Sequence, residues 1–121
     1  MKRQETGRRG EELARKYLEE RGYLVLETNY RCPEGEIDIV AVDGETLVFV
    51  EVRAKTGRAF GTPEESITLA KIRHLNRAAA RYCQEHEGLP PERRIDVVAV
   101  EMDGRGRVRR LELYENAVGE V

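Results

Sequence analysis

The sequence contains no tryptophan, only two cysteines and no long hydrophobic run. Cys32 and Cys83 lack the spacing of a zinc site, so we expect two reduced thiols in a cytoplasmic protein. The polar start MKRQETGRRGEELARKYLEE does not resemble a signal peptide, and no segment is long enough to span a membrane. Repeats, low-complexity tracts and glycine-rich phosphate loops are also missing from the sequence. We therefore expect neither a secreted disulfide scaffold nor a membrane protein.

Charge is abundant but unevenly distributed. Of the 121 residues, 40% are hydrophobic and 36% are charged, which predicts a single domain over residues 1–121 with one core and a very polar surface. Residues 34–51 carry six carboxylates and no Lys or Arg, whereas residues 53–81 carry seven Lys or Arg against two Glu. This order suits a metal site beside a phosphate groove, although on charge alone an ordinary mixed surface is the simpler interpretation.

Hydrophobic periodicity and turn residues predict an α/β fold with the order α-β-β-β-α-β-β. We expect helices from about residue 4 to 21 and from about 64 to 87, because glycine follows each and Pro63 precedes the second. The segments YLVLETNYR, GEIDIVAV, TLVFVEVRA, IDVVAVEM and VRRLELYE are typical of strands, with an Asp-Gly hairpin turn between the second and third. A central mixed sheet flanked by helices is the natural architecture.

Two carboxylates interrupt the apolar central strands. Strand alternation places Ile37 and Ile39 on one face and Asp38 on the other. Glu51 shares its face with Phe49 and lies between valines. If the two carboxylates share a face on adjacent strands, both can reach one cation, without which their like charges resist ionising together. Oxygen ligands of this kind suit Mg²⁺ or Mn²⁺.

Each predicted helix adds a charged residue at its apolar stripe. Glu11 lies at the edge of the first stripe and could face the sheet, or it could be a solvated glutamate that favours the helix N-terminus. Gly7 and Gly10 fall on the inner side, where the helix could approach the sheet or a ligand closely. Lys71 falls within the second stripe, either facing the site or extending its amine to solvent.

The outer side of the second helix carries arginines at i, i+4 spacing, including Arg73 and Arg77. Such a ridge is either a solvated face or a contact for a phosphate backbone. Asp96, at the start of a predicted strand, marks the strand end or pairs with Arg94, and we assign it no catalytic role.

The stretch GEIDIVAVDGETLVFVEVRAK resembles the metal-site hairpin of the PD-(D/E)xK nuclease superfamily. More closely, residues 5–102, with GRRGEELARKYLEERGYLVLETNYR, GEIDIVA, FVEVR and TLAKIRHL, resemble the YraN family of bacterial proteins. That family is described as endonuclease-like and is similar to archaeal Holliday-junction resolvases. The resemblance implies a restriction-endonuclease-like fold, a DNA substrate with branched DNA as one candidate, and a Mg²⁺ or Mn²⁺ cofactor.

Position by position, the resemblance makes Asp38 and Glu51 metal ligands and matches Glu11 to a helix glutamate of the resolvases. Two departures stand out. Ile37 occupies the place of the superfamily's proline, and Arg53 occupies the place of its catalytic lysine. An arginine cannot serve as a general base, yet it can hold a phosphate or the charge of a transition state.

We therefore expect a metal-dependent DNA endonuclease of resolvase type. The predicted catalytic residues are Asp38, Glu51, Arg53 and Lys55, with Glu11, Asp38 and Glu51 as metal ligands. Lys55 or Lys71 could supply the amine that Arg53 cannot. The predicted nucleic-acid contacts are Arg8, Arg58, Lys71, Arg73 and Arg77.

Two alternatives stay open. One is a nucleic-acid-binding module that keeps the fold without turnover, and the other is an interaction domain that docks a protein partner. Cutting both strands of a junction would favour a homodimer.

Overall fold

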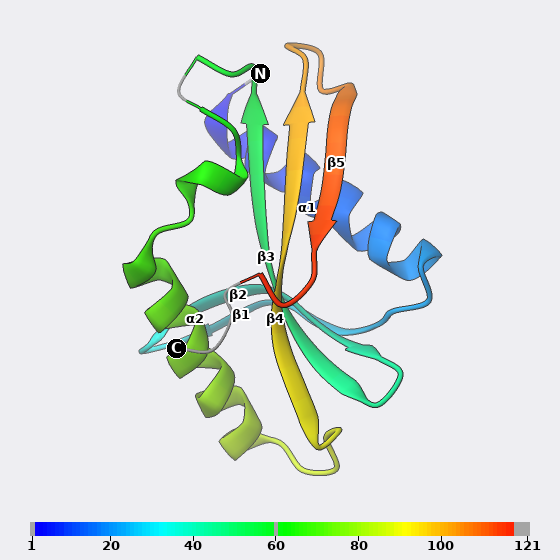
Figure 1. Cartoon of the computed structure of the whole chain (residues 1–121), viewed down its shortest axis with the longest axis vertical. Coiled ribbons are helices and arrows are strands. Elements are labelled where there is room, and N and C mark those ends of the chain that lie inside the picture. Colours follow the sequence, from blue (N-terminus) through cyan, green and yellow to red (C-terminus); the bar gives the residue numbers. More distant parts are fainter. Residues whose placement is uncertain (1, 60, 118–121) are drawn as a thin grey trace.

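The computed structural model describes residues 2–59 and 61–117 and confirms the α/β class and the predicted order of elements. Figure 1 shows a twisted sheet between two helices. The elements, in chain order, are α1 (Arg3–Glu20), β1 (Leu24–Cys32), β2 (Gly35–Asp43), β3 (Thr46–Thr56), the short 3₁₀ helix η1 (Glu64–Ser66), α2 (Leu69–Glu85), β4 (Glu92–Met102) and β5 (Val108–Tyr114).

The five strands form one mixed sheet in the order β1-β2-β3-β4-β5. Only β3 and β4 pair in parallel, and the other neighbours pair antiparallel. Parallel neighbours need a long crossover, which α2 and the segment before it supply. Gly44, with φ of 60°, forms the tight turn that joins β2 to β3.

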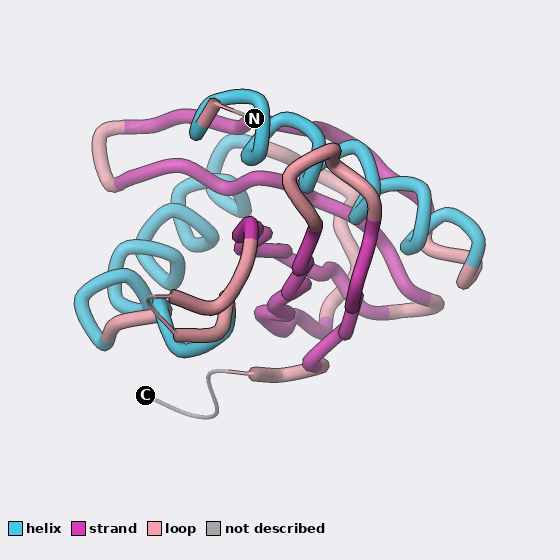
Figure 2. Tube along the Cα trace, turned by 90° about the horizontal axis from the view of Figure 1, so that it is seen from above, coloured by secondary structure: helices cyan, strands magenta, loops and turns pink. Residues whose placement is uncertain are grey.

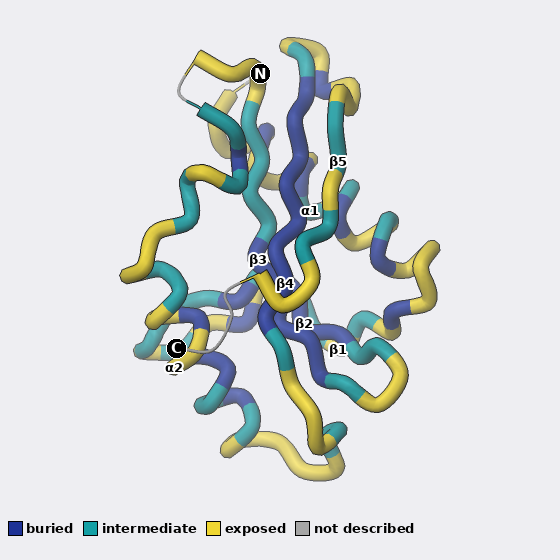
Figure 3. The backbone as a smooth tube through the Cα atoms, in the orientation of Figure 1, coloured by how far each residue is buried: buried dark blue, intermediate teal, exposed yellow. Residues whose placement is uncertain are grey.

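The two helices cover opposite faces of the sheet, so the central strands are apolar on both sides (Figure 2). On one face, Ala14 and Leu18 of α1 pack against a layer that includes Val50 and Val98. On the other face, Leu75 and Tyr82 of α2 pack against a second layer. Figure 3 shows the resulting burial along most of β4. A sheet covered on both faces explains the runs of Val and Ile in the sequence.

A glycine lets α1 lie directly on β3. A Cβ atom at Gly10 would be 2.5 Å from the Cβ of Ala54, closer than any real contact, so no larger residue fits there without a shift. The expected close approach is confirmed at this position. At Gly7, one turn earlier, a Cβ atom would meet nothing within 4 Å. Gly7 is exposed and has open space beside it, so the expected close approach to the sheet does not extend to this position.

The second helix begins later than predicted. The expected start near residue 64 is wrong, because Glu64–Ser66 form the separate turn η1 and Ile67 is extended, with φ of −75° and ψ of 119°. Thr68 then caps α2, and its hydroxyl accepts a hydrogen bond from the backbone N–H of Lys71 at 3.1 Å. This cap fixes the first turn of α2, which carries Lys71.

Among the described residues, no helix combines the length and apolar character that crossing a membrane would require.

Candidate functional site

The site lies where β2 and β3 separate. Their ladder ends at the pair Ile39 and Val50, while β2 continues beside β1 and β3 continues beside β4. In the opening, the backbone N–H of Val52 donates to Oδ2 of Asp38 at 2.7 Å. A side-chain carboxylate thus replaces the backbone partner that β3 loses there. This bond holds Asp38 in the gap between the strands.

The predicted alternation fails at this point. Ile37 packs in the layer beneath α2, whereas Ile39 packs in the layer beneath α1, so the expectation that they share a face is wrong. The change of face coincides with the end of the β2–β3 ladder, beyond which β2 follows β1 alone. The two-residue alternation therefore does not determine the face on which Asp38, between the two isoleucines, lies.

Glu51 is the most deeply buried acid of the site, with 3% of its surface exposed. Its Oε2 lies 3.0 Å from Nη2 of Arg53 and 3.4 Å from Nζ of Lys71. Burial, followed by the negative charge of Asp38 and a hydrogen bond to it, raises the pKa of Glu51 to about 8, against the lowering effect of the two cations. The predicted inward position of Lys71 is confirmed.

Glu11, on α1, lies beside the carboxylate of Asp38. Burial and then the charge of Asp38 raise the pKa of Glu11 to about 7, while a hydrogen bond from Asn29 lowers it. The expectation that Glu11 faces the sheet is therefore confirmed. Asp38 lies between Glu11 and Glu51, and each of these glutamates is held beside it by a hydrogen bond.

The carboxylate oxygens of this cluster are the type of ligand that a hard divalent cation prefers. Carboxyl groups from α1 and β3 lie on either side of Asp38 of β2, and the raised pKa values of both glutamates indicate that the cluster favours extra positive charge. A cation that accepts one or two carboxylates and keeps several waters, such as Mg²⁺, could replace the shared protons. In the described part of the chain, no three acidic, histidine or cysteine side chains form a ready ligand set around one point. Two of the three carboxylates at a time are therefore the natural ligands.

Sequence reasoning missed Asn29. It lines a cavity of about 200 Å³ together with Glu11, Asp38 and Arg8. Its φ of 54° lies in the left-handed region, which asparagine tolerates better than most residues. An asparagine within a predicted strand could have signalled this position, but nothing in the sequence links it to Glu11.

The other predicted contacts lie at different places. Arg8 borders the acidic cavity, and Lys55 lines a groove on β3. Arg58 makes a bidentate ion pair with Glu101, at 2.7 and 3.0 Å. Arg73 and Arg77 are exposed on α2, and neither lines the acidic cavity or the groove on β3.

Comparison with known proteins gives a consistent family. A family model described as "Uncharacterised protein family UPF0102" matches residues 10–100. A UPF0102 protein of Arthrobacter sp. (strain FB24) is 52% identical over 103 residues, covering 85% of this chain and 87% of that protein. A UPF0102 protein of Dehalococcoides mccartyi is 49% identical over 118 residues, covering 98% of this chain and 96% of that protein. The chain belongs to the UPF0102 family, for which YraN is the other name.

Proposed function

We propose that this protein is a Mg²⁺- or Mn²⁺-dependent DNA endonuclease of resolvase type that hydrolyses phosphodiester bonds, with branched DNA as its leading candidate substrate. The observation that carries the proposal is the position of Asp38 between Glu11 and Glu51, whose pKa values are both raised. Arg53 and Lys71 lie against the same cluster. Carboxylates that favour a cation, next to cations that favour phosphate, are what metal-assisted phosphodiester hydrolysis needs.

Asp38 and Glu51 would hold the metal, with Glu11 as a third ligand or as the partner that orients Asp38. A metal held there would supply a coordinated water of lowered pKa, and thus a source of hydroxide near neutral pH. The N–H of Val52 fixes Asp38, so this ligand is oriented before any cation arrives. Preorganisation of this kind lowers the cost of forming the site.

Arg53 and Lys71 have different parts in the proposal. Arg53 stays protonated, so it would stabilise the negative charge that grows on the phosphate oxygens rather than accept a proton. Lys71 brings an amine to 3.4 Å from Glu51, although it comes from a helix and not from the strand position where the superfamily has its lysine. We assign to Lys71 the orientation of the attacking water.

The test is cleavage of synthetic four-way, flap and linear DNA in Mn²⁺. Asp38→Asn and Glu51→Gln should each reduce the rate by at least about 100-fold, because each removes a charge that holds the metal. Glu20→Gln, an exposed acid at the end of α1, should cut like the wild type. Cutting that survives both substitutions at the site would rule out this assignment.

A second candidate is a nucleic-acid-binding module without turnover. The ion pairs favour it, since Arg53 and Lys71 both point their charge at Glu51 and can neutralise that carboxylate without a metal. This function predicts DNA binding that needs no divalent cation, with every substrate left intact.

A further inference from the structure

A second hollow adjoins the acidic cluster. It is a groove of about 790 Å³ between the start of α1, the end of β3 and the loop that follows β3. Among the described residues, its lining includes three cations and no carboxylate. The lining residues are Arg3, Thr6, Gly7, Val52, Arg53, Ala54, Lys55, Thr56, Gly57, Ala59 and Ser66.

We propose that this groove binds the phosphodiester backbone of the DNA strand whose bond lies at the carboxylate cluster. The inference rests on the proposed function and adds the path of the strand. Val52 and Arg53 belong to both places, because the N–H of Val52 holds Asp38 and Arg53 pairs with Glu51. The groove therefore begins where the cluster ends and continues along β3 to the start of α1.

The chemistry of the lining suits phosphates. Arg3, Arg53 and Lys55 provide positive charge from two elements, and the lining also includes the hydroxyl residues Thr56 and Ser66. Such side chains make most protein contacts to a DNA backbone. Nε of Arg53 is buried and has no hydrogen-bond partner among the described residues, and Nη2 of the same guanidinium pairs with Glu51.

Two glycines widen the access. Gly7 and Gly57 both line the groove, and at each position a Cβ atom would meet nothing within 4 Å. A phosphate can thus approach the backbone of α1 and of the loop without meeting a side chain. Thr6, next to Gly7, is buried, and its hydroxyl lies 3.3 Å from that of Thr56, which ties the two sides of the groove together.

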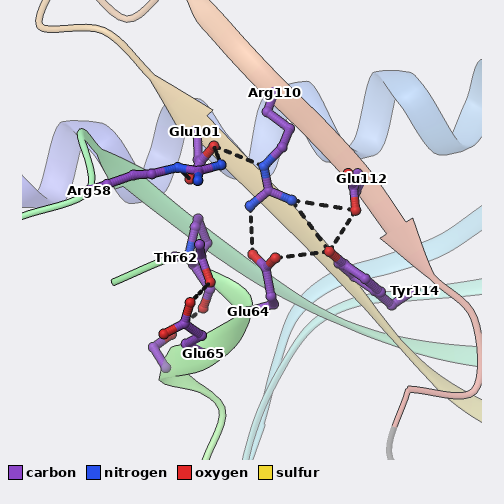
Figure 4. Close-up of polar contacts among 10 residues, drawn as sticks. Arg58, Thr62, Glu64, Glu65, Glu101, Arg110, Glu112 and Tyr114 are labelled. Atoms are coloured by element: carbon purple, nitrogen blue, oxygen red, sulfur yellow. Dashed lines mark hydrogen bonds and ion pairs between the residues drawn. The ribbon is translucent and has the colours of Figure 1, made fainter. Parts of the chain in front are cut away.

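Polar contacts hold the segment after β3 against β4 and β5 (Figure 4). Arg58 is paired with Glu101, and Glu64 accepts hydrogen bonds from Arg110 at 2.6 Å and from Tyr114 at 2.9 Å. These bonds attach Arg58 and Glu64 to β4 and β5. Glu101 and Glu64 are thereby paired with arginines, which offsets their negative charge near the positive lining of the groove.

The sharpest test changes Gly7, which belongs to the groove and not to the acidic cluster. Gly7→Glu places a negative charge in the groove where there is room for the side chain. Gly7→Ala is the matched control, because it adds a Cβ atom without charge. Both substitutions replace a helical glycine by a better helix former, so neither should lower Tm.

Binding is measured by fluorescence anisotropy with labelled duplex and four-way DNA, in EDTA so that no strand is cut. We expect Gly7→Glu to bind about tenfold more weakly than Gly7→Ala, with Tm at or above that of the wild type. A companion variant, Arg3→Gln with Lys55→Gln, should make the slope of log K against log salt shallower by about 1.5, since two phosphate contacts are lost. Arg109→Gln, which removes an exposed arginine of β5, should leave the slope unchanged.

The possible outcomes distinguish failure of the groove proposal from failure of the proposed nuclease activity. Equal affinity of Gly7→Glu and Gly7→Ala, or no DNA binding by the wild type at low salt, overturns the groove. Loss of binding in Gly7→Glu, together with a wild type that never cuts in Mn²⁺, keeps the groove and removes the nuclease. If the wild type cuts DNA and Gly7→Glu cuts it equally well, the nuclease is kept and the groove is removed.

Discussion

Glu51 is a residue that the fold holds at an electrostatic cost. It is nearly fully buried beside another carboxylate, and two cations do not bring its pKa back to the usual range. Glu11 shows the same effect more weakly at the other side of Asp38. Sites that must receive a charged partner are often arranged in this way, because the partner relieves the repulsion.

The cost predicts how stability depends on pH. Because the pKa of Glu51 is raised from 4.5 to about 8 in the folded protein, the folded state binds protons more tightly than the unfolded state between these values. The free energy of unfolding should therefore fall as pH rises across this window when no metal is present. Glu51→Gln removes the titrating group, so it should make the metal-free protein more stable at pH 8 by about 1–3 kcal/mol.

Urea denaturation in EDTA at pH 5 and pH 8 checks this prediction. The wild type should lose more stability between the two pH values than Glu51→Gln does, and Glu20→Gln should follow the wild type. If Glu51→Gln is destabilised at pH 8 as much as at pH 5, then its carboxylate is not held at a cost.

At the scale of elements, the hydrophobic pattern was enough to predict the helices and strands, but not their departures from regularity. The start of α2 depends on the cap at Thr68, a local hydrogen bond that competes with the apparent helical signal of Pro63 and Glu64. The change of face at Ile37 coincides with the point where β2 and β3 separate, which no two-residue pattern contains. Both departures shape the site.

The seating of α1 on β3 gives a prediction with an internal control. Gly10→Ala would bring its Cβ atom to 2.5 Å from that of Ala54, so α1 must shift and the protein should lose about 1–3 kcal/mol of stability. Gly7→Ala has open space and should gain up to about 1 kcal/mol from helix propensity. Thermal unfolding of the two variants gives the comparison, and a Gly10→Ala protein as stable as Gly7→Ala would show that α1 does not lie against β3 here.

At the scale of the whole molecule, a buried polar network joins distant segments. Asp96 is fully buried and accepts hydrogen bonds from Arg94 at 3.0 Å and from the backbone N–H of Asn116 at 2.9 Å. Arg94 also donates to the hydroxyl of Tyr23 at 2.7 Å and to Asp43 at 2.9 Å. The network fastens the start of β1, the end of β2 and the segment after β5 to β4. The sequence indicated only the Arg94–Asp96 pair, because the other partners are far away along the chain.

Removing the centre of this network should therefore be costly. Arg94→Ala leaves the charge of Asp96 buried with fewer partners, which should destabilise the protein by about 2–4 kcal/mol. Arg107→Ala removes an exposed arginine whose ion pair with Asp103 spans four residues, and it should cost less than about 0.5 kcal/mol. Urea midpoints measure both, and similar midpoints for the two variants would contradict a structural role for the network.

The same scale explains why the site was only partly visible in the sequence. Asp38, Glu51 and Lys71 could be found from apolar patterns interrupted by charge, and all three meet in the structure. Asn29 and the groove could not, because they depend on how α1, β1 and β3 lie against one another.

We propose that Asp38 and one of its two neighbouring glutamates hold a divalent cation. Isothermal titration of Mn²⁺ into the metal-free protein at pH 8 tests it most directly. We predict one saturable site in the wild type and in Glu20→Gln, weaker binding at pH 6 because bound protons compete with the metal, and no measurable site in Asp38→Asn. Mn²⁺ binding of equal strength in the wild type and in Asp38→Asn would contradict the account.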